Sequence, residues 1–78
     1  MTEFRSDWGQ FDFVLKEYCI KNHISKNKLM RIADLQFAQL KSYYNNTVVR
    51  PDLTVLARIC FALECDLSDI LKYTPPKK

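Results

Sequence analysis

Residues 25–45 decide how this chain folds, and they read SKNKLMRIADLQFAQLKSYYN. Ser25 precedes an apolar pattern over residues 26–33, and a serine hydroxyl there can accept hydrogen bonds from the free amides of a first helical turn. A second helical pattern covers residues 37–45, where Leu40 and Tyr43 share one face because they are three residues apart. The sequence therefore predicts two short helices joined by residues 34–36 alone.

The joining residues, Asp34-Leu35-Gln36, contain one apolar side chain. Two short helices around so tight a turn are typical of a helix-turn-helix, which sets its second helix out for the major groove of DNA. Asn45-Asn46-Thr47 ends the second helix, because asparagine tolerates the left-handed conformation at a helix end. We expect a helix-turn-helix between Ser25 and Asn45.

Three more helices are expected around this unit. The first covers Gln10 to Asn22, the next begins at Pro51 or Asp52, and a last short helix is capped by Ser68. No strand alternation is apparent, so the expected fold class is all-α. The apolar residues that define these helices are Phe11, Val14, Leu15, Tyr18 and Cys19; Leu53, Leu56, Ala57, Cys60 and Leu63; and Ile70, Leu71 and Tyr73.

The length and composition predict a single domain over residues 1–78, with an N-terminal extension at 1–9 and a mobile tail at 74–78. A chain of 78 residues holds one modest core, and its 47% apolar and 27% charged residues are ordinary for a globular protein. No apolar run approaches the roughly 20 residues of a membrane span. Acidic Glu3 and Asp7 stand where a signal peptide is basic. We expect a cytoplasmic protein with no membrane partner.

Catalytic and metal chemistry find little support in the sequence. Cys19, Cys60 and Cys65 are odd in number and lack a zinc-site spacing, so buried free thiols are expected. His23 has no partner at a spacing that suits a metal or a general base. Gly9 is the only glycine, which excludes a glycine-rich phosphate loop. We therefore expect a protein that is not an enzyme and that binds no cofactor, metal or small-molecule substrate.

The net charge of +3 is concentrated in the middle of the chain. Residues 25–50 hold five basic residues against one acidic residue, Asp34, whereas the flanking segments are close to neutral. Such a local basic patch is the footprint of a surface that binds phosphate backbone, although a merely solvated basic face would have the same composition. The five are Lys26, Lys28, Arg31, Lys41 and Arg50.

Three segments, ISKNKL (24–29), RPDL (50–53) and CDLSDIL (65–71), together resemble the phage-repressor (Cro/Xre-like) helix-turn-helix family. The likeness runs from about Asp12 to Pro75, and its strength lies in the order and spacing of the segments. The resemblance implies a compact, five-helix, lambda-repressor-like transcriptional regulator. It also implies that helix 37–45 docks in the major groove of double-stranded DNA, and that a homodimer binds a palindromic site.

The resemblance also assigns roles to single positions. The core positions of the motif are Leu29, Ala33, Leu35, Leu40 and Tyr43. The phosphate-contacting positions are Lys26, Asn45 and Arg50. The base-facing positions are Gln36, Phe37, Ala38, Lys41 and Ser42.

The chain departs from the family pattern at several of these places. Asp34 replaces the usual glycine of the turn, Met30 replaces a small residue, and Gln36 is a poorer cap than serine. Phe37 and Ala38 offer bases only apolar contact, chiefly to a thymine methyl, so weak discrimination is expected from them.

An alternative therefore stays open, a protein-interaction module that kept the fold and no longer reads DNA. Its docking surface would comprise Phe37, Tyr44 and Trp8. Phe4 and Trp8 in the N-terminal extension either lie across the core or form a patch that contacts a partner.

Overall fold

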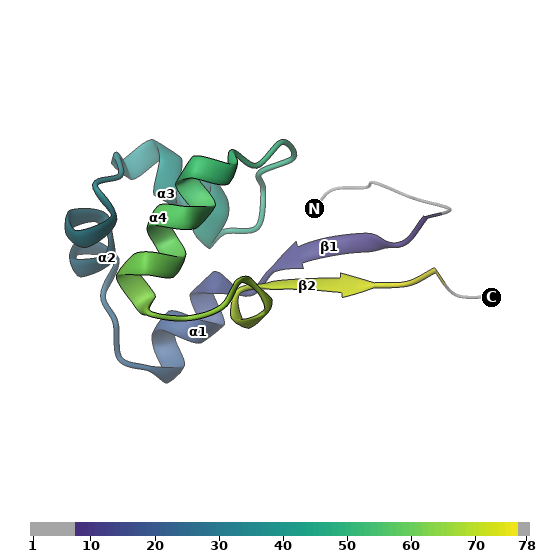
Figure 1. The fold of residues 1–78 in the computed structure, drawn as a ribbon, viewed down its shortest axis with the longest axis horizontal. Helices are drawn as coiled ribbons and strands as arrows, with labels where there is room; N and C mark the ends of the chain where they lie inside the picture. The colour runs from purple at the N-terminus through teal and green to yellow at the C-terminus, as the bar shows by residue number, and fades with distance from the viewer. Residues whose placement is uncertain (1–7, 77–78) are drawn as a thin grey trace.

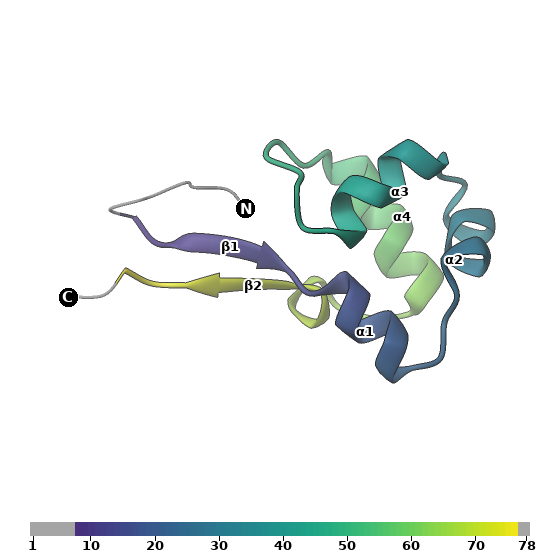
Figure 2. The same ribbon diagram turned by 180° about the vertical axis from the view of Figure 1, so that it is seen from behind.

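The computed structural model describes residues 8–76, which form a helical body and a projecting two-stranded arm (Figure 1). The body contains α1 (Leu15–Lys21), α2 (Lys26–Ala33), α3 (Phe37–Tyr44) and α4 (Leu53–Leu63). A 3-10 turn, η1 (Leu67–Asp69), leads into the arm. The arm pairs β1 (Gln10–Phe13) with β2 (Leu71–Thr74) in antiparallel order, and the view from behind shows it extending away from the helices (Figure 2).

The arm corrects the expected all-α, five-helix architecture at both ends of the chain. Residues 10–13 were expected to begin the first helix but form β1, and the predicted last helix is replaced by η1 and β2. Phe11 and Phe13 are two residues apart, which is the repeat of a strand, and they pair with Tyr73 and Leu71 across the sheet. Aromatic residues favour this pleated, half-buried setting. In the described part of the chain, four α-helices and one small sheet make up the fold.

The segment before β2 is also organised differently from the prediction. Ser68 lies inside η1, and Asp66 stands before it, where its backbone N–H donates to Asp69 Oδ2 at 3.0 Å. Thr74 pairs with Gln10 and so belongs to the sheet, although the predicted tail begins there. Lys77 and Lys78 of that tail lie outside the described residues.

Close approach of the two chain ends explains the single glycine. Gly9 has a φ of 97°, and a Cβ added to it would lie 2.4 Å from the backbone oxygen of Thr74. The Tyr73 hydroxyl donates to the backbone oxygen of Trp8 at 2.6 Å. Trp8 itself is 83% exposed, so the first of the two alternatives, that it lies across the core, is wrong for this residue; Phe4 lies outside the described residues.

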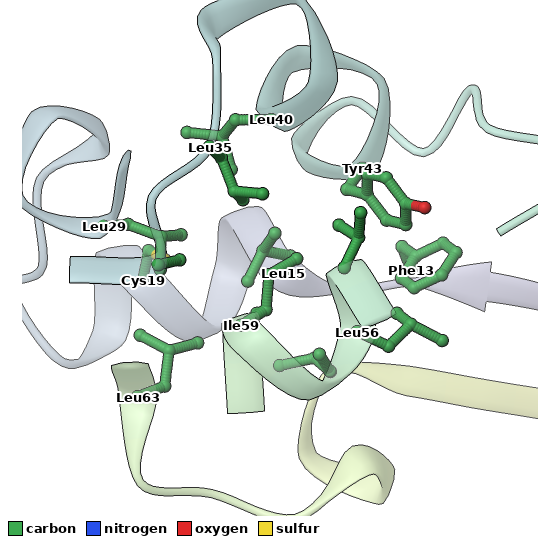
Figure 3. Close-up of a cluster of buried hydrophobic side chains, with 13 residues drawn as sticks. Phe13, Leu15, Cys19, Leu29, Leu35, Leu40, Tyr43, Leu56, Ile59 and Leu63 are labelled. Atoms are coloured by element: carbon green, nitrogen blue, oxygen red, sulfur yellow. The ribbon is translucent and has the colours of Figure 1, made fainter. Parts of the chain in front are cut away.

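The core gathers apolar side chains from every helix and from the base of the arm (Figure 3). The Phe13 ring meets the Tyr43 ring edge to face at a centroid distance of 5.3 Å, which attaches β1 to α3. The predicted core positions of the helix-turn-helix are all buried. These are Leu29, Ala33, Leu35, Leu40 and Tyr43.

The buried face of α4 differs from the predicted one. Leu56 and Leu63 are buried as expected, but Val55 and Ile59 complete the face. Leu53 is 79% exposed and Ala57 is exposed as well. The apolar residues of α4 therefore form two stripes, and only one of them contacts the core.

The helices of residues 8–76 all fall short of the length and apolar character that a membrane crossing requires.

Candidate nucleic-acid interface

The start of α2 is fixed by the cap that the sequence predicts. Ser25 Oγ accepts a hydrogen bond from the Lys28 backbone N–H at 3.1 Å. This satisfies one of the free donors of the first turn and leaves Lys26 exposed at the helix start.

The turn between α2 and α3 depends on a left-handed residue. Asp34 has a φ of 57°, which confirms that aspartate takes the conformation usually left to glycine here. The Leu35 N–H donates to the Met30 backbone oxygen at 3.0 Å, and Arg58 Nη1 donates to the Asp34 backbone oxygen at 3.2 Å. Leu35 is buried beneath the turn. Backbone geometry, a hydrogen bond from α4 and core packing thus hold α3 in one orientation.

The start of α3 is closed by the side chain of Gln39, because the side chain of its N-cap residue makes no capping hydrogen bond. Gln36 is the N-cap residue, and Gln39 Oε1 accepts from its backbone N–H at 3.3 Å. Gln36 was expected to be a poor cap, and the second glutamine supplies part of what serine would provide. Both side chains are exposed.

The outer side of α3 carries four of the five predicted base-facing residues, together with one predicted phosphate contact, Asn45. Phe37, Lys41 and Asn45 stand four residues apart along one line, and Ala38 and Ser42 form the adjacent line. All five are exposed except Ser42, which is half-buried. The helix therefore presents one continuous surface of mixed apolar and polar character.

The polar groups on this surface differ in availability. The Ser42 hydroxyl already donates to the Gln39 backbone oxygen at 3.0 Å. Phe37 is 55% exposed and has only apolar atoms to offer. Lys41 is exposed, and its ammonium has no hydrogen-bond partner among residues 8–76. Lys41 is thus the long donor best placed for an external acceptor.

The predicted phosphate contact Lys26 has a partner that the sequence did not reveal. Its Nζ lies 4.9 Å from the centre of the Tyr44 ring, a cation–π contact between the start of α2 and the end of α3. Asn45, another predicted phosphate contact, follows Tyr44 directly in the sequence.

Asn46 is a second residue whose role the sequence did not reveal. It has a φ of 60°, its Oδ1 accepts from the Phe13 N–H at 2.7 Å, and its Nδ2 donates to Asp12 Oδ1 at 3.0 Å. Hydrogen bonds from Gln10 and Asn46 lower the pKa of the Asp12 carboxyl. The segment after α3 is thereby tied to the arm; the helix ends at Tyr44 with Asn45 as its C-cap, and the left-handed residue expected over 45–47 is Asn46.

Arg50 lies in the connection between α3 and α4, which is anchored on both sides. The Thr47 N–H donates to the Ser42 backbone oxygen at 2.9 Å, and the Tyr43 hydroxyl accepts from the Asp52 N–H at 2.9 Å. Arg50 itself is exposed. All five basic residues of the central segment are exposed, so the charge seen in the sequence is available at the surface.

The cysteines are free thiols, with Cys19 buried and the other two half-buried. Burial, with a smaller contribution from Cys60, raises the pKa of Cys65 to about 11, so this thiol is protonated at neutral pH. No three side chains able to hold a metal come together within residues 8–76.

Comparison with known proteins agrees with this geometry. Residues 14–76 match the family of Cro/C1-type helix-turn-helix DNA-binding domains. This chain belongs to that family. None of the curated proteins compared with the sequence matches it.

The Cro/C1-type domain also has a structural neighbour. The crystal structure described as "transcriptional regulator VanUg, Form II" has a TM-score of 0.69 and 23% identity, with 97% of this chain and 100% of that chain covered. At this identity the likeness concerns the fold. The family match begins at Val14, so β1 lies outside the residues matched by the family.

Proposed function

We propose that this Cro/C1-type domain regulates transcription by laying α3, about residues 37–45, in the major groove of double-stranded DNA. The carrying observation is that all five basic residues of segment 25–50, which stand before, within and after α3 in the sequence, are exposed. Electrostatic attraction to phosphates then supplies affinity, and α3 supplies selectivity.

Lys26, Asn45 and Arg50 are the proposed phosphate contacts. All three are exposed, and each stands next to a fixed point of the fold: the α2 cap, the end of α3 and the anchored connection. Phosphate contacts from rigid positions set the register of a protein on its duplex without reading bases.

The proposed base-facing residues are Gln36, Phe37, Ala38, Lys41 and Ser42. Phe37 and Ala38 suit thymine methyl groups, and Lys41 suits the acceptors of guanine. Because the Ser42 hydroxyl is engaged within the helix, Lys41 carries most of the hydrogen-bonding selectivity.

A homodimer on two half-sites completes the proposal. The eight residues of α3 span only about 12 Å, so one copy reads a short site. Two copies placed about one DNA turn apart read enough base pairs for selectivity. The structural neighbour, a transcriptional regulator by its description, supports a regulatory role.

The test selects bound sequences from a random duplex pool and then measures affinity at several salt concentrations. We expect Lys26→Ala and Arg50→Ala each to reduce the slope of log K against log salt by about 0.9 without changing the selected sequence. Lys41→Ala should alter the selected sequence at one position. Lys72→Ala, a matched loss of charge on the arm, should change neither quantity. An affinity that does not depend on salt would contradict the proposal.

The apolar start of α3 favours one competing function, a protein-interaction module. Phe37 is 55% exposed and Trp8 is 83% exposed, although Tyr44 is half-buried beneath Lys26. Absence of binding to any duplex at low salt, together with tight binding to a protein through Phe37, would decide for this alternative.

A further inference from the structure

The longest helix has an apolar face that covers nothing within residues 8–76. Leu53, Ala57 and Phe61 stand four residues apart on α4, and we call them the α4 stripe. Leu53 is 79% exposed, Phe61 is 77% exposed, and Ala57 is exposed between them. The other face of α4 packs against the core. Single exposed apolar residues are normal, but three in line on one helix indicate an interaction surface.

The α4 stripe has the shape of a surface that pairs with itself. A small residue lies at its centre and a large residue at each end, so two antiparallel copies would set Leu53 of each chain against Phe61 of the other. Ala57 would then meet Ala57 on the two-fold axis, where a small side chain allows the helices to approach closely. Such a contact is isologous, as the interface of a two-fold dimer must be.

The available area suits a dimer. Val49, 78% exposed, lies just before the stripe in the connection to α4. Together with the α4 stripe it offers roughly 400 to 500 Å² for burial on each chain, because a large aromatic side chain alone buries at least about 150 Å². Two chains together would bury about 800 to 1,000 Å², which is the size of a small interface and suits association at micromolar concentrations.

We propose that the α4 stripe is a dimerisation surface whose occupant is a second copy of this chain, with the two α4 helices antiparallel about an axis at Ala57. This inference rests on exposure and symmetry and not on the proposed function.

Sedimentation of the full chain over a range of micromolar concentrations tests the surface. We expect the unaltered chain to dimerise, and Leu53→Asp or Phe61→Asp to weaken association at least about thirtyfold, because each sets an unpaired charge against the apolar partner residue. Ile20→Asp, a matched change at a 61% exposed residue of α1, should leave association unchanged. Circular dichroism confirms that each variant keeps its helices.

A cross-link tests the axis. Ala57→Cys should give a reducible dimer under mild oxidation, because two packed helices bring facing Cα atoms within the roughly 4.4 to 6.8 Å that a disulfide spans. The change is made with Cys60 and Cys65 replaced by alanine, and Lys16→Cys in the same background is the control. Lys16 is exposed on α1 and should not cross-link.

A monomer at every concentration would overturn the proposal, as would a dimer that survives both aspartate variants or one that only Phe11→Asp on the arm dissociates. A chain that dimerises through the stripe but binds no duplex would refute the proposed function and leave this inference standing. A dimer that binds duplex and that neither stripe variant dissociates would refute this inference and leave the proposed function standing.

Discussion

The outer faces of α3 and α4 are built on the same plan and differ in chemistry. Each helix places one face on the core, through fully buried Leu40 and Ile59, and shows solvent a line of residues four apart. On α3 the line runs from an aromatic residue to a lysine and an asparagine, whereas on α4 it is apolar throughout. The α3 face thus suits a hydrated polyanion, and the α4 face suits another apolar protein surface.

The comparison shows that an apolar repeat does not by itself identify a core face. Leu53 and Ala57 have helical spacing with Leu56 and Cys60, and the sequence alone assigns all four to the core. The structure separates them, because Val55 and Ile59 fill the interior instead. Leu53 and Ala57 stay at the surface, and packing of the core does not explain why they are apolar.

The largest expected effect separates the two faces of α4. Ile59→Ala should lower the free energy of unfolding by about 3 kcal/mol, because it leaves a cavity at a fully buried position. Leu53→Ala removes a similar side chain from the exposed face and should cost less than about 0.5 kcal/mol. Urea unfolding at low protein concentration measures both. Equal losses would mean that the two faces do not differ as described.

A smaller effect compares the starts of the two helices. Ser25→Ala and Asp52→Ala each remove a side chain that caps a first turn, at 3.1 Å from the Lys28 N–H and 2.8 Å from the Thr54 N–H. Each should destabilise the domain by about 1 kcal/mol, measured by thermal unfolding. Ser68→Ala, where the predicted cap makes no such bond, is the control and should have little effect.

Substitutions at the ends of α2 and α4 should raise the free energy of unfolding, whereas the preceding substitutions lower it. Asp34 and Glu64 both have left-handed backbones, with φ of 57° and 54°. Glycine removes the clash of a Cβ in this conformation, so Glu64→Gly should stabilise the domain by about 0.5 to 1 kcal/mol. Asp34→Gly should gain less, since aspartate tolerates this region better than glutamate. A loss of stability in Glu64→Gly would contradict the strain inferred at the end of α4.

The smallest effect concerns the link between α3 and the arm. Hydrogen bonds from Gln10 and Asn46 lower the pKa of Asp12 below its usual 3.8, so the folded state favours the carboxylate. Its contribution to stability is complete above the unfolded pKa and is lost as the pH falls through the lowered one. Asp12→Asn should flatten this part of the acid unfolding profile. An unchanged profile would show that the carboxylate contributes nothing.

The helix-turn-helix could be predicted because its determinants are local. Ser25, Asp34 and Leu35 act on backbone within a few residues of themselves, and the structure confirms the cap, the left-handed turn and the buried leucine. The arm could not be predicted, because Phe11 also fits a helical repeat with Val14 and Leu15. What makes it a strand is Tyr73, at the other end of the chain.

The candidate site also combines features that the sequence predicts with features that only the fold reveals. The exposed positions of Lys41 and Arg50 follow from local pattern and charge. The contact of Lys26 with Tyr44 and the bonds of Asn46 to β1 needed the three-dimensional fold, since each joins segments that sequence spacing does not relate. The roles of these residues toward DNA stay predictions.

The hydrogen bond between Tyr73 and Trp8 joins residues 65 positions apart and so bears on how the chain folds. Helices form from neighbouring residues within microseconds, whereas pairing of distant segments waits for most of the chain to be ordered. The two strands of the arm should therefore pair after the helices have formed. The backbone amides of the arm should also exchange with deuterated water before those of the core helices. Local stability should therefore be lowest in the arm and highest in the helical body.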